Sequence, residues 1–279
     1  PSRYGGGKRV THMFAWAPPG GMYPYAYTVN NSEGLQQIYI NNWPYLIDKE
    51  GQSVNKEPAW DPKSARFVFT SNRTGNGDIY LWDGGEEIQL TYDEVHAELY
   101  PNWAPDGSNR VAFVRAGKAE SQVMVLDVNA FSSVPLVNFG GADSTRPSFS
   151  PDGSKIAFFS NKGNASVQEF GLWVVDARPG STPRNIGPKV SLPSKGAASW
   201  TPDGKGVIAS LDSPDAGDPL AVFPVDGGAP RNLATGTYNN RDPQLQVIDG
   251  QWRVVFTSQG LESKKEKTWQ RLFVYDIPH

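Results

Sequence analysis

Residues 103–114, WAPDGSNRVAFV, form a phrase that the chain repeats with small changes. The phrase returns as WDPKSARFVFTS at 60–71, FSPDGSKIAFFS at 149–160 and WTPDGKGVIAS at 200–210, so successive copies begin 43 to 51 residues apart. This spacing is typical of four-stranded propeller blades. The sequence therefore predicts a repeat protein built from blade-sized units.

Each copy predicts a strand, a tight turn and a second strand. The Pro-Asp-Gly triplet favours the turn, because Pro presets φ near −65° and Gly accepts a positive φ. The second strand, as in residues 111–114 and 156–159, is almost wholly apolar, which indicates packing on both faces. A third apolar strand ends at an aspartate in five units, namely Asp83, Asp127, Asp176, Asp226 and Asp276. A more polar fourth strand follows and suits an outer sheet edge.

The two ends of the chain complete the repeat pattern. Residues 16–21, WAPPGG, match the phrase one period earlier, and a degenerate final unit begins near Asp242. The predicted blades are residues 14–50, 55–95, 98–140, 144–190, 196–235 and 240–279. The last unit stops after its third strand, and residues 7–13 resemble the missing fourth strand. We therefore expect residues 8–13 to pair with residues 270–275 and to close the ring, which removes two open sheet edges.

These patterns predict one all-β domain over residues 1–279. The expected fold is a six-bladed β-propeller of four-stranded antiparallel blades, closed by the N-terminal strand in the last blade. Repeat architectures of this length commonly form one domain.

Composition excludes some classes of function. A formal net charge of −3 and a pI near 5.7 argue against a nucleic-acid surface, which normally shows a basic stripe. The basic run at 264–267 is interpreted as a solvated loop. No apolar segment approaches membrane-spanning length. Because the chain has no cysteine, disulfides and thiolate metal sites are excluded.

Catalytic motifs are absent from the sequence. It contains neither a G-x-S-x-G nucleophile elbow nor an H-E-x-x-H zinc motif, and its three histidines lie far apart at positions 12, 96 and 279. Paired carboxylates of the kind used in glycoside chemistry stay open, because acidic residues of different blades can meet across a channel. We expect a non-enzymatic protein without a cofactor or a metal.

Propeller geometry predicts where binding should occur. First strands line the axis, and the connections that enter them share one face, the channel mouth, with the hairpins between second and third strands. The residues expected there are Lys56, Glu57, His96, Tyr100, Arg146, Arg241 and Asp242. Mixed charge around a narrow opening suits a peptide or a small polar ligand. For His96 two interpretations remain, a hydrogen-bonded loop histidine, or a ligand or proton carrier at the channel mouth.

A second surface is suggested by aromatic residues outside the repeat pattern. Trp43 and Tyr45 follow the third strand of the first unit and do not occupy a repeat position. If exposed, they would offer a partner or sugar surface; the alternative is burial beneath a neighbouring loop.

Residues 70–80, TSNRTGNGDIY, carry a family resemblance. Ser-Asn-Arg-x-Gly before an Asp-Ile-Tyr strand resembles the repeats of TolB-type propellers, a WD-repeat-like β-propeller family. The resemblance covers the propeller only, without the N-terminal α/β domain of TolB. It implies a periplasmic or secreted scaffold that binds a protein or peptide, such as an envelope lipoprotein or a larger assembly. The alternatives are a carbohydrate-active propeller enzyme similar to oligogalacturonate lyases, and the non-catalytic propeller of a larger prolyl-oligopeptidase-type peptidase.

Overall fold

The computed structural model describes residues 14–16, 25–30, 33–40, 45–46, 52–193, 196–213, 217–259 and 271–277. Every regular element in these ranges is a β-strand, and the named strands pair in antiparallel sheets, so the predicted all-β class is confirmed. No helix long and apolar enough to cross a membrane occurs in these ranges.

The chain divides into two compact units, residues 1–118 with 126–133 and residues 119–125 with 134–279. The single domain predicted over residues 1–279 stays a prediction.

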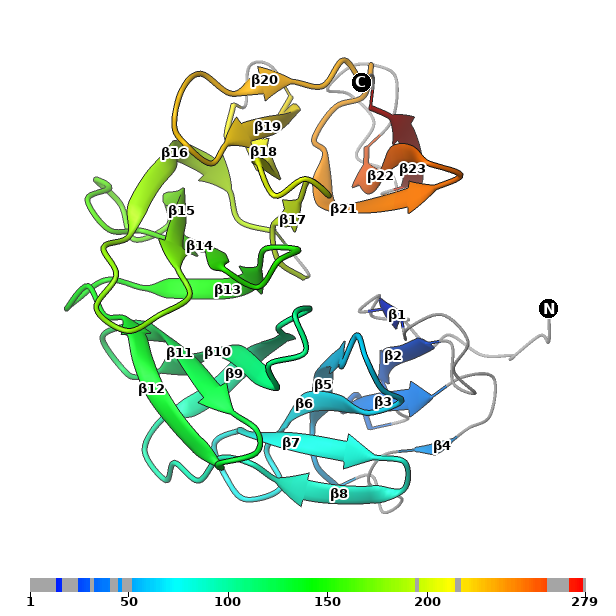
Figure 1. Cartoon of the computed structure of the whole chain (residues 1–279), viewed down its shortest axis with the longest axis vertical. Coiled ribbons are helices and arrows are strands. Elements are labelled where there is room, and N and C mark those ends of the chain that lie inside the picture. The colour runs from blue at the N-terminus through cyan, green and yellow to red at the C-terminus, as the bar shows by residue number, and fades with distance from the viewer. Residues whose placement is uncertain are drawn as a thin grey trace. The chain divides into compact units, whose positions relative to one another are not determined.

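Two four-stranded sheets belong to the first unit (Figure 1). One contains β1 (Phe14–Trp16), β2 (Tyr25–Asn30), β3 (Gln36–Ile40) and β4 (Tyr45–Leu46) in that order. The other contains β5 (Asn55–Trp60), β6 (Phe67–Ser71), β7 (Asp78–Asp83) and β8 (Glu86–Gln89). A third sheet contains β9 (Ala97–Trp103), β10 (Arg110–Ala116), β11 (Ser121–Asp127) and β12 (Ser132–Val137), with β9 and β10 in the first unit. The strand order in each sheet follows the order of the chain, as the four-stranded repeat predicts.

The remaining strands belong to the second unit. They are β13 (Ser144–Phe149), β14 (Lys155–Ser160), β15 (Phe170–Asp176) and β16 (Arg184–Ser191), then β17 (Ser199–Trp200), β18 (Gly206–Leu211), β19 (Leu220–Pro224) and β20 (Arg231–Asn232), and finally β21 (Arg241–Ile248), β22 (Gln251–Ser258) and β23 (Arg271–Asp276). The first two groups of four are joined into one sheet by a short pairing of β16 with β18, at Val190–Leu211 and Ser191–Ser210. Sequence reasoning missed this pairing, because it depends on how closely two neighbouring repeats approach.

The Pro-Asp-Gly turns form as predicted and are held by their aspartates. Asp152 Oδ1 accepts hydrogen bonds from Ser150 Oγ at 2.6 Å and from the backbone N of Ser154 at 3.0 Å. Asp203 accepts equivalent bonds from Thr201 Oγ1 and Lys205 N, at 2.6 and 3.0 Å. Each carboxylate therefore replaces the backbone partners that a tight turn leaves unsatisfied.

These turns make stability depend on acid pH. The hydrogen bond from Ser150, followed by those from Ser154, lowers the pKa of Asp152 from 3.8 to about 2. A lowered carboxyl pKa stabilises the fold above pH 3.8, and that contribution is lost as pH falls towards 2. As pH is lowered from 3.8 towards 2, we expect the urea midpoint of the Asp152→Asn variant to fall less than that of the unchanged chain, as measured by circular dichroism. Asp226→Asn is the control, because Asp226 is exposed and makes no hydrogen bond to the described residues; an equal flattening there would contradict the prediction.

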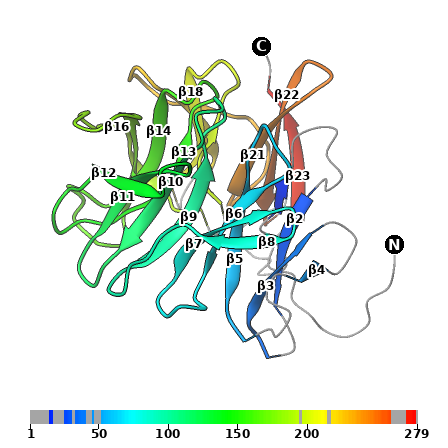
Figure 2. The same cartoon turned by 60° about the horizontal axis from the view of Figure 1, so that its bottom comes forward.

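The core lies between neighbouring sheets of each unit. In the first unit, Ala26, Ile38 and Ile40 pack against a cluster of aromatic residues from the next sheet, namely Trp60, Phe67, Phe69, Tyr80 and Trp82. The two sheets lie side by side, with β2 and β3 next to β5 (Figure 2). In the second unit, Phe159, Leu172 and Val174 pack against Val207, Ala221 and Phe223. Strand β6 is buried at every residue, which confirms the prediction of second strands packed on both faces.

Gly187 in β16 is required by close packing. A Cβ atom at this position would lie 2.6 Å from Phe223 Cε1, and Phe223 is itself only 1% exposed. We expect Gly187→Ala to lower the free energy of unfolding by about 1–3 kcal/mol, the usual cost of overpacking, as measured by chemical denaturation. Phe223→Leu removes the clashing ring atoms, so adding Gly187→Ala to that variant should cost much less. An unchanged cost would show that the clash is not the cause.

The last described sheet has an open edge at β23. It has three strands, in the order β21-β22-β23, and the predicted fourth strand at residues 7–13 lies outside the described residues. Two apolar side chains of β23, Leu272 and Val274, are 71% and 61% exposed. The apolar pattern of the third strands therefore does not lead to burial at β23, because no described sheet of its unit covers that face.

Candidate functional site

Four of the predicted binding residues share a backbone irregularity that recurs in the repeats. The residue before the first-strand proline is left-handed in four repeats, with φ values of 61° at Glu57, 55° at Tyr100, 53° at Arg146 and 52° at Asp242. At each point the register of the first strand on the second strand shifts, as in a β-bulge. A left-handed conformation costs a non-glycine residue about 1–2 kcal/mol. Such conformations persist where the surroundings enforce them, often at ligand sites.

In the first unit, Glu57 ties two of these bulges together. Its side chain is buried, and Oε2 accepts a hydrogen bond from the backbone N of Tyr100 at 2.7 Å. The same oxygen accepts a bond from Thr70 Oγ1 at 3.0 Å, and Lys56 Nζ lies 3.3 Å from Oε1. The carboxylate of one repeat therefore holds the left-handed residue of the next.

Lys56 and Tyr100 form the surface above this carboxylate. Lys56 Nζ lies 5.9 Å from the centroid of the Tyr100 ring, and both residues are half-buried. The structure thus brings together three predicted residues as one group, which we call the Lys56 platform (Lys56, Glu57 and Tyr100). An aromatic ring beside an ammonium group can pack an apolar side chain and pair with a carboxylate of the same ligand.

In the second unit, Arg146 makes the corresponding link. Its Nη1 donates to the carbonyl oxygen of Gly196 at 2.9 Å. Two further bonds cross between the same strands, from Ser148 Oγ to the Ala198 carbonyl at 2.9 Å and from Trp200 Nε1 to the Ser148 carbonyl at 3.0 Å. Arg146 therefore joins one repeat to the next, as Glu57 does in the first unit.

Arg241 is held by a carboxylate that sequence reasoning did not single out. Its Nη2 lies 3.0 Å from Oδ2 of Asp218, which is buried and left-handed with φ 46°. Asp218 Oδ1 also accepts a bond from the backbone N of Ser213 at 2.9 Å. The positive charge of Arg241 is thus already paired.

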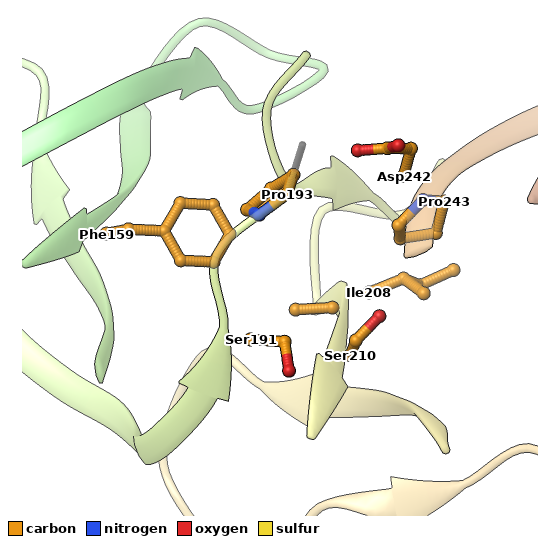
Figure 3. Close-up of a pocket in the computed structure, with 9 residues that line it drawn as sticks. Phe159, Ser191, Pro193, Ile208, Ser210, Asp242 and Pro243 are labelled. Carbon is orange, nitrogen blue, oxygen red and sulfur yellow. The ribbon is translucent and has the colours of Figure 1, made fainter. Parts of the chain in front are cut away.

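Asp242 is one of the residues that line a small hollow whose enclosed space does not admit a water molecule (Figure 3). The walls are mostly apolar, with Phe159 and Pro193 facing Ile208 and Pro243, and two hydroxyl groups come from Ser191 and Ser210. Pockets for whole small ligands are usually about 300–1,000 Å³. This hollow is therefore not a preformed ligand pocket, and the binding role predicted for Asp242 stays a prediction.

His96 belongs to a separate network of charged side chains. Its Nδ1 lies 3.0 Å from Asp93 Oδ1, which also accepts bonds from the backbone N of Val95 and of His96, at 2.9 and 2.8 Å. Arg115 connects this loop to the strand, with Nε 3.2 Å from Asp93 Oδ2 and Nη2 2.8 Å from Glu98 Oε1. The structure therefore shows His96 hydrogen-bonded within a loop, and its predicted role in binding stays a prediction.

The two carboxyl groups of this network shift in opposite directions. Burial raises the pKa of the fully buried Glu98, and hydrogen bonds from Thr91 and Arg115 offset the rise only in part. At Asp93 burial is outweighed by the bonds from His96 and Val95, so the pKa of Asp93 is lowered. Arg115 thus joins a half-buried ionised carboxylate to a fully buried one that resists ionisation.

Glu98 occupies a repeat position that sequence reasoning missed. Four repeats have a fully buried polar residue five places before the residue that opens the repeated phrase (Trp60, Trp103, Phe149 and, in the degenerate last repeat, Leu245). These polar residues are Asn55, Glu98, Ser144 and Asn240. Asn55 Nδ2 donates to Gln37 Oε1 at 3.0 Å, and Asn240 Nδ2 donates to the Asp218 carbonyl at 3.2 Å. The recurrence of a polar residue at this position was the sequence signal that could have revealed these buried residues.

The second predicted surface stays a prediction. Trp43 lies outside the described residues, and Tyr45 is described only as part of β4. In the described part of the chain no three His, Asp or Glu side chains are grouped so that they could hold a metal ion.

Comparisons with known proteins place the chain among propellers. No protein-family model matches the sequence. A TolB homologue of Chlorobium luteolum is 24% identical over 158 residues, which is 55% of this chain and 34% of the homologue. An uncharacterized peptidase of Bacillus subtilis, YuxL, is 31% identical over 118 residues, 38% of this chain and 17% of the peptidase. The chain thus spans only 34% and 17% of the length of these two curated relatives.

Solved structures agree over most of the chain. TolB from Acinetobacter baumannii has a TM-score of 0.61 at 18% identity, and the match covers 94% of this chain and 60% of the TolB chain. Oligogalacturonate lyase from Vibrio parahaemolyticus has a TM-score of 0.61 at 15% identity, over 91% of this chain and 74% of its own. The propeller domain of the trilobed protease from Pyrococcus furiosus has a TM-score of 0.62 at 14% identity, over 96% of this chain and 81% of its own. By these likenesses the chain has a TolB-like β-propeller fold.

Proposed function

We propose that the chain is a non-enzymatic propeller of the bacterial envelope or secreted space that binds a protein or peptide. The observation that carries the proposal is the Lys56 platform, where a left-handed bulge in each of two repeats presents an ammonium group beside a half-buried ring. The platform is supported by strands and by a buried carboxylate, so it is pre-organised for binding. An envelope lipoprotein or a larger assembly is the proposed class of partner, and the TolB-like fold supports this choice.

The proposal can be tested by selecting peptides from a displayed random library on the intact chain. We expect selected peptides to lose at least about tenfold in affinity, about 1.4 kcal/mol, when Lys56→Ala or Tyr100→Ala is introduced. The matched controls are Lys205→Ala and Phe131→Ala, which alter an exposed lysine and an exposed aromatic residue in turns at the other end of the strands. Equal loss in the controls would contradict the assigned surface, and failure to select any peptide would contradict the binding function.

A second candidate is the non-catalytic propeller of a larger peptidase. It is favoured by the 31% identity to the YuxL peptidase and by the likeness to the trilobed protease propeller. The likeness to oligogalacturonate lyase favours a third, a carbohydrate-active enzyme. Formation of unsaturated uronides from polygalacturonate by the purified chain would establish the lyase, whereas we expect none.

We further propose six blades and closure of the ring by residues 7–13. The support is that no described strand pairs with the outer edge of β23, and that two apolar side chains of this strand, Leu272 and Val274, are exposed. Because the chain has no cysteine, pairs of single cysteines at residues 9–12 and at Leu272 or Val274 can be scanned for oxidation. A disulfide within one chain, detected by non-reducing electrophoresis and mass spectrometry, is expected. Crosslinks found only between chains would contradict closure within the chain.

A further inference from the structure

The hairpin loop 72–77, between β6 and β7, is joined to the connection 91–96 that carries His96. Asn76 Nδ2 donates a hydrogen bond to the Glu94 carbonyl at 2.7 Å. One residue later, the Gly77 carbonyl accepts a bond from the backbone N of Glu98, also at 2.7 Å. Asn76 is exposed, so this bond is the outer of the two. We call the pair the Asn76 latch.

The residue after Asn76 must be a glycine. Gly77 has φ +128° and Gly75 has φ +133°, values that side-chain-bearing residues rarely adopt. Gly77 N donates no hydrogen bond to any described residue. The loop therefore places an exposed carboxamide directly before a glycine, which has no Cβ of its own and whose backbone nitrogen donates no hydrogen bond to the described residues.

We propose that Asn76 is a site of spontaneous deamidation and isomerisation. Gly77 N attacks Cγ of Asn76, a new N–Cγ bond forms, the Cγ–Nδ2 bond breaks, and ammonia leaves with the proton from Gly77. Water then opens the cyclic imide at either carbonyl and yields aspartate or isoaspartate. The net reaction converts one amide and one water into a carboxylate and ammonium, with no oxidant or cofactor.

The product destroys the Asn76 latch. A carboxylate at residue 76 cannot donate to the Glu94 carbonyl. It also adds negative charge beside three acidic residues, Asp78, Asp93 and Glu94. Asp78 and Asp93 are in contact, because the backbone N of Asp93 donates to Asp78 Oδ1 at 3.2 Å. Isoaspartate in addition lengthens the main chain by one carbon, next to the carbonyl that holds Glu98. The modification thus loosens the entry to β9, the strand that carries Tyr100.

The test follows residue 76 in the intact chain at mildly alkaline pH. Peptide mapping by mass spectrometry gives the conversion, and an isoaspartyl carboxyl-methyltransferase with labelled S-adenosylmethionine detects isoaspartate. A synthetic peptide of residues 74–79 gives the rate without the fold, which should be higher because the latch and the burial of Gly77 restrain the attack. Exposed Asn72 and Asn138, each followed by a larger residue, are controls within the chain.

We expect Asn76 to convert at least about tenfold faster than Asn72 and Asn138, a barrier difference of about 1.4 kcal/mol. Asn76→Gln should abolish the label. An unchanged Asn76 at the time the peptide is fully converted would overturn the proposal, as would equal rates at the three asparagines. Asn76→Asp should lower the urea midpoint relative to the unmodified chain, and a wild-type midpoint would overturn the stated consequence for the latch.

Discussion

Replacing Arg115 by alanine is expected to lower the free energy of unfolding by about 3–5 kcal/mol at neutral pH, the usual cost of removing one partner of a buried ion pair. Arg115 is the cation that faces Glu98, whose side chain is 0% exposed, and it holds Asp93 at the same time. Without the guanidinium, Glu98 must ionise unpaired in the interior or stay protonated. Either outcome costs free energy, and urea denaturation measures it.

The pH dependence of this loss identifies its cause. Burial already raises the pKa of Glu98 above its ordinary 4.5, and loss of Arg115 raises it further. A raised carboxyl pKa means that stability is lost as pH rises from 4.5 through the folded pKa. The penalty of Arg115→Ala should therefore be smaller at mildly acidic pH than at neutral pH.

A second substitution provides the control. Glu98→Gln keeps the shape and removes the buried charge, so the Glu98→Gln/Arg115→Ala double variant should recover most of the lost stability. The Arg115→Lys variant should fall between, because a single ammonium cannot reproduce contacts to two carboxylates. A pH-independent penalty with no recovery in the double variant would show that Arg115 acts through packing and not through Glu98.

Replacing Glu57 by alanine is expected to cost about 2–4 kcal/mol. The change leaves the backbone N–H of Tyr100 and the hydroxyl of Thr70 without their hydrogen-bond acceptor. Each buried group left unsatisfied costs about 1–3 kcal/mol. Glu57→Gln keeps an oxygen acceptor in place and should lose less. The free energy of unfolding from urea titration measures each variant.

The backbone of Glu57 provides an independent check of the bulge. At φ 61° an alanine retains the left-handed strain, whereas glycine does not. Glu57→Gly should therefore be more stable than Glu57→Ala by about 1 kcal/mol, although glycine loses more chain entropy on folding. The opposite order would contradict the left-handed conformation at this residue.

These effects bear on how the proposed binding function is tested. Glu57 and Arg146 each join neighbouring repeats, so substitutions there change stability and binding together. Arg241 is paired with buried Asp218 and carries the same difficulty. Lys56 Nζ lies 3.3 Å from Oε1 of the buried Glu57, so the stability of Lys56→Ala must be measured beside its affinity. Glu57 binds the backbone N of Tyr100, which Tyr100→Ala retains, so the Tyr100 side chain is the more informative position for binding experiments.

The amino-acid sequence by itself determined the repeat, the turns and the buried strands. The Pro-Asp-Gly turns form at Asp152 and Asp203, and the apolar runs at β6 and β14 are buried, because turn chemistry and residue periodicity act over a few neighbouring residues. The position of Lys56, Glu57 and Tyr100 relative to the repeat proline was also predicted from spacing alone. The resemblance in residues 70–80 identified the TolB-like fold.

Only the tertiary structure decided what those residues contact. The carboxylate of Glu57 reaches the backbone of Tyr100, and the guanidinium of Arg146 reaches that of Gly196, because neighbouring repeats bring segments 43 and 50 residues apart together. Equally, β23 has the apolar pattern of a buried strand, yet Leu272 and Val274 are exposed. Burial and pairing depend on which sheet lies alongside a strand, and that neighbour is set by long-range packing, which short-range sequence patterns do not encode.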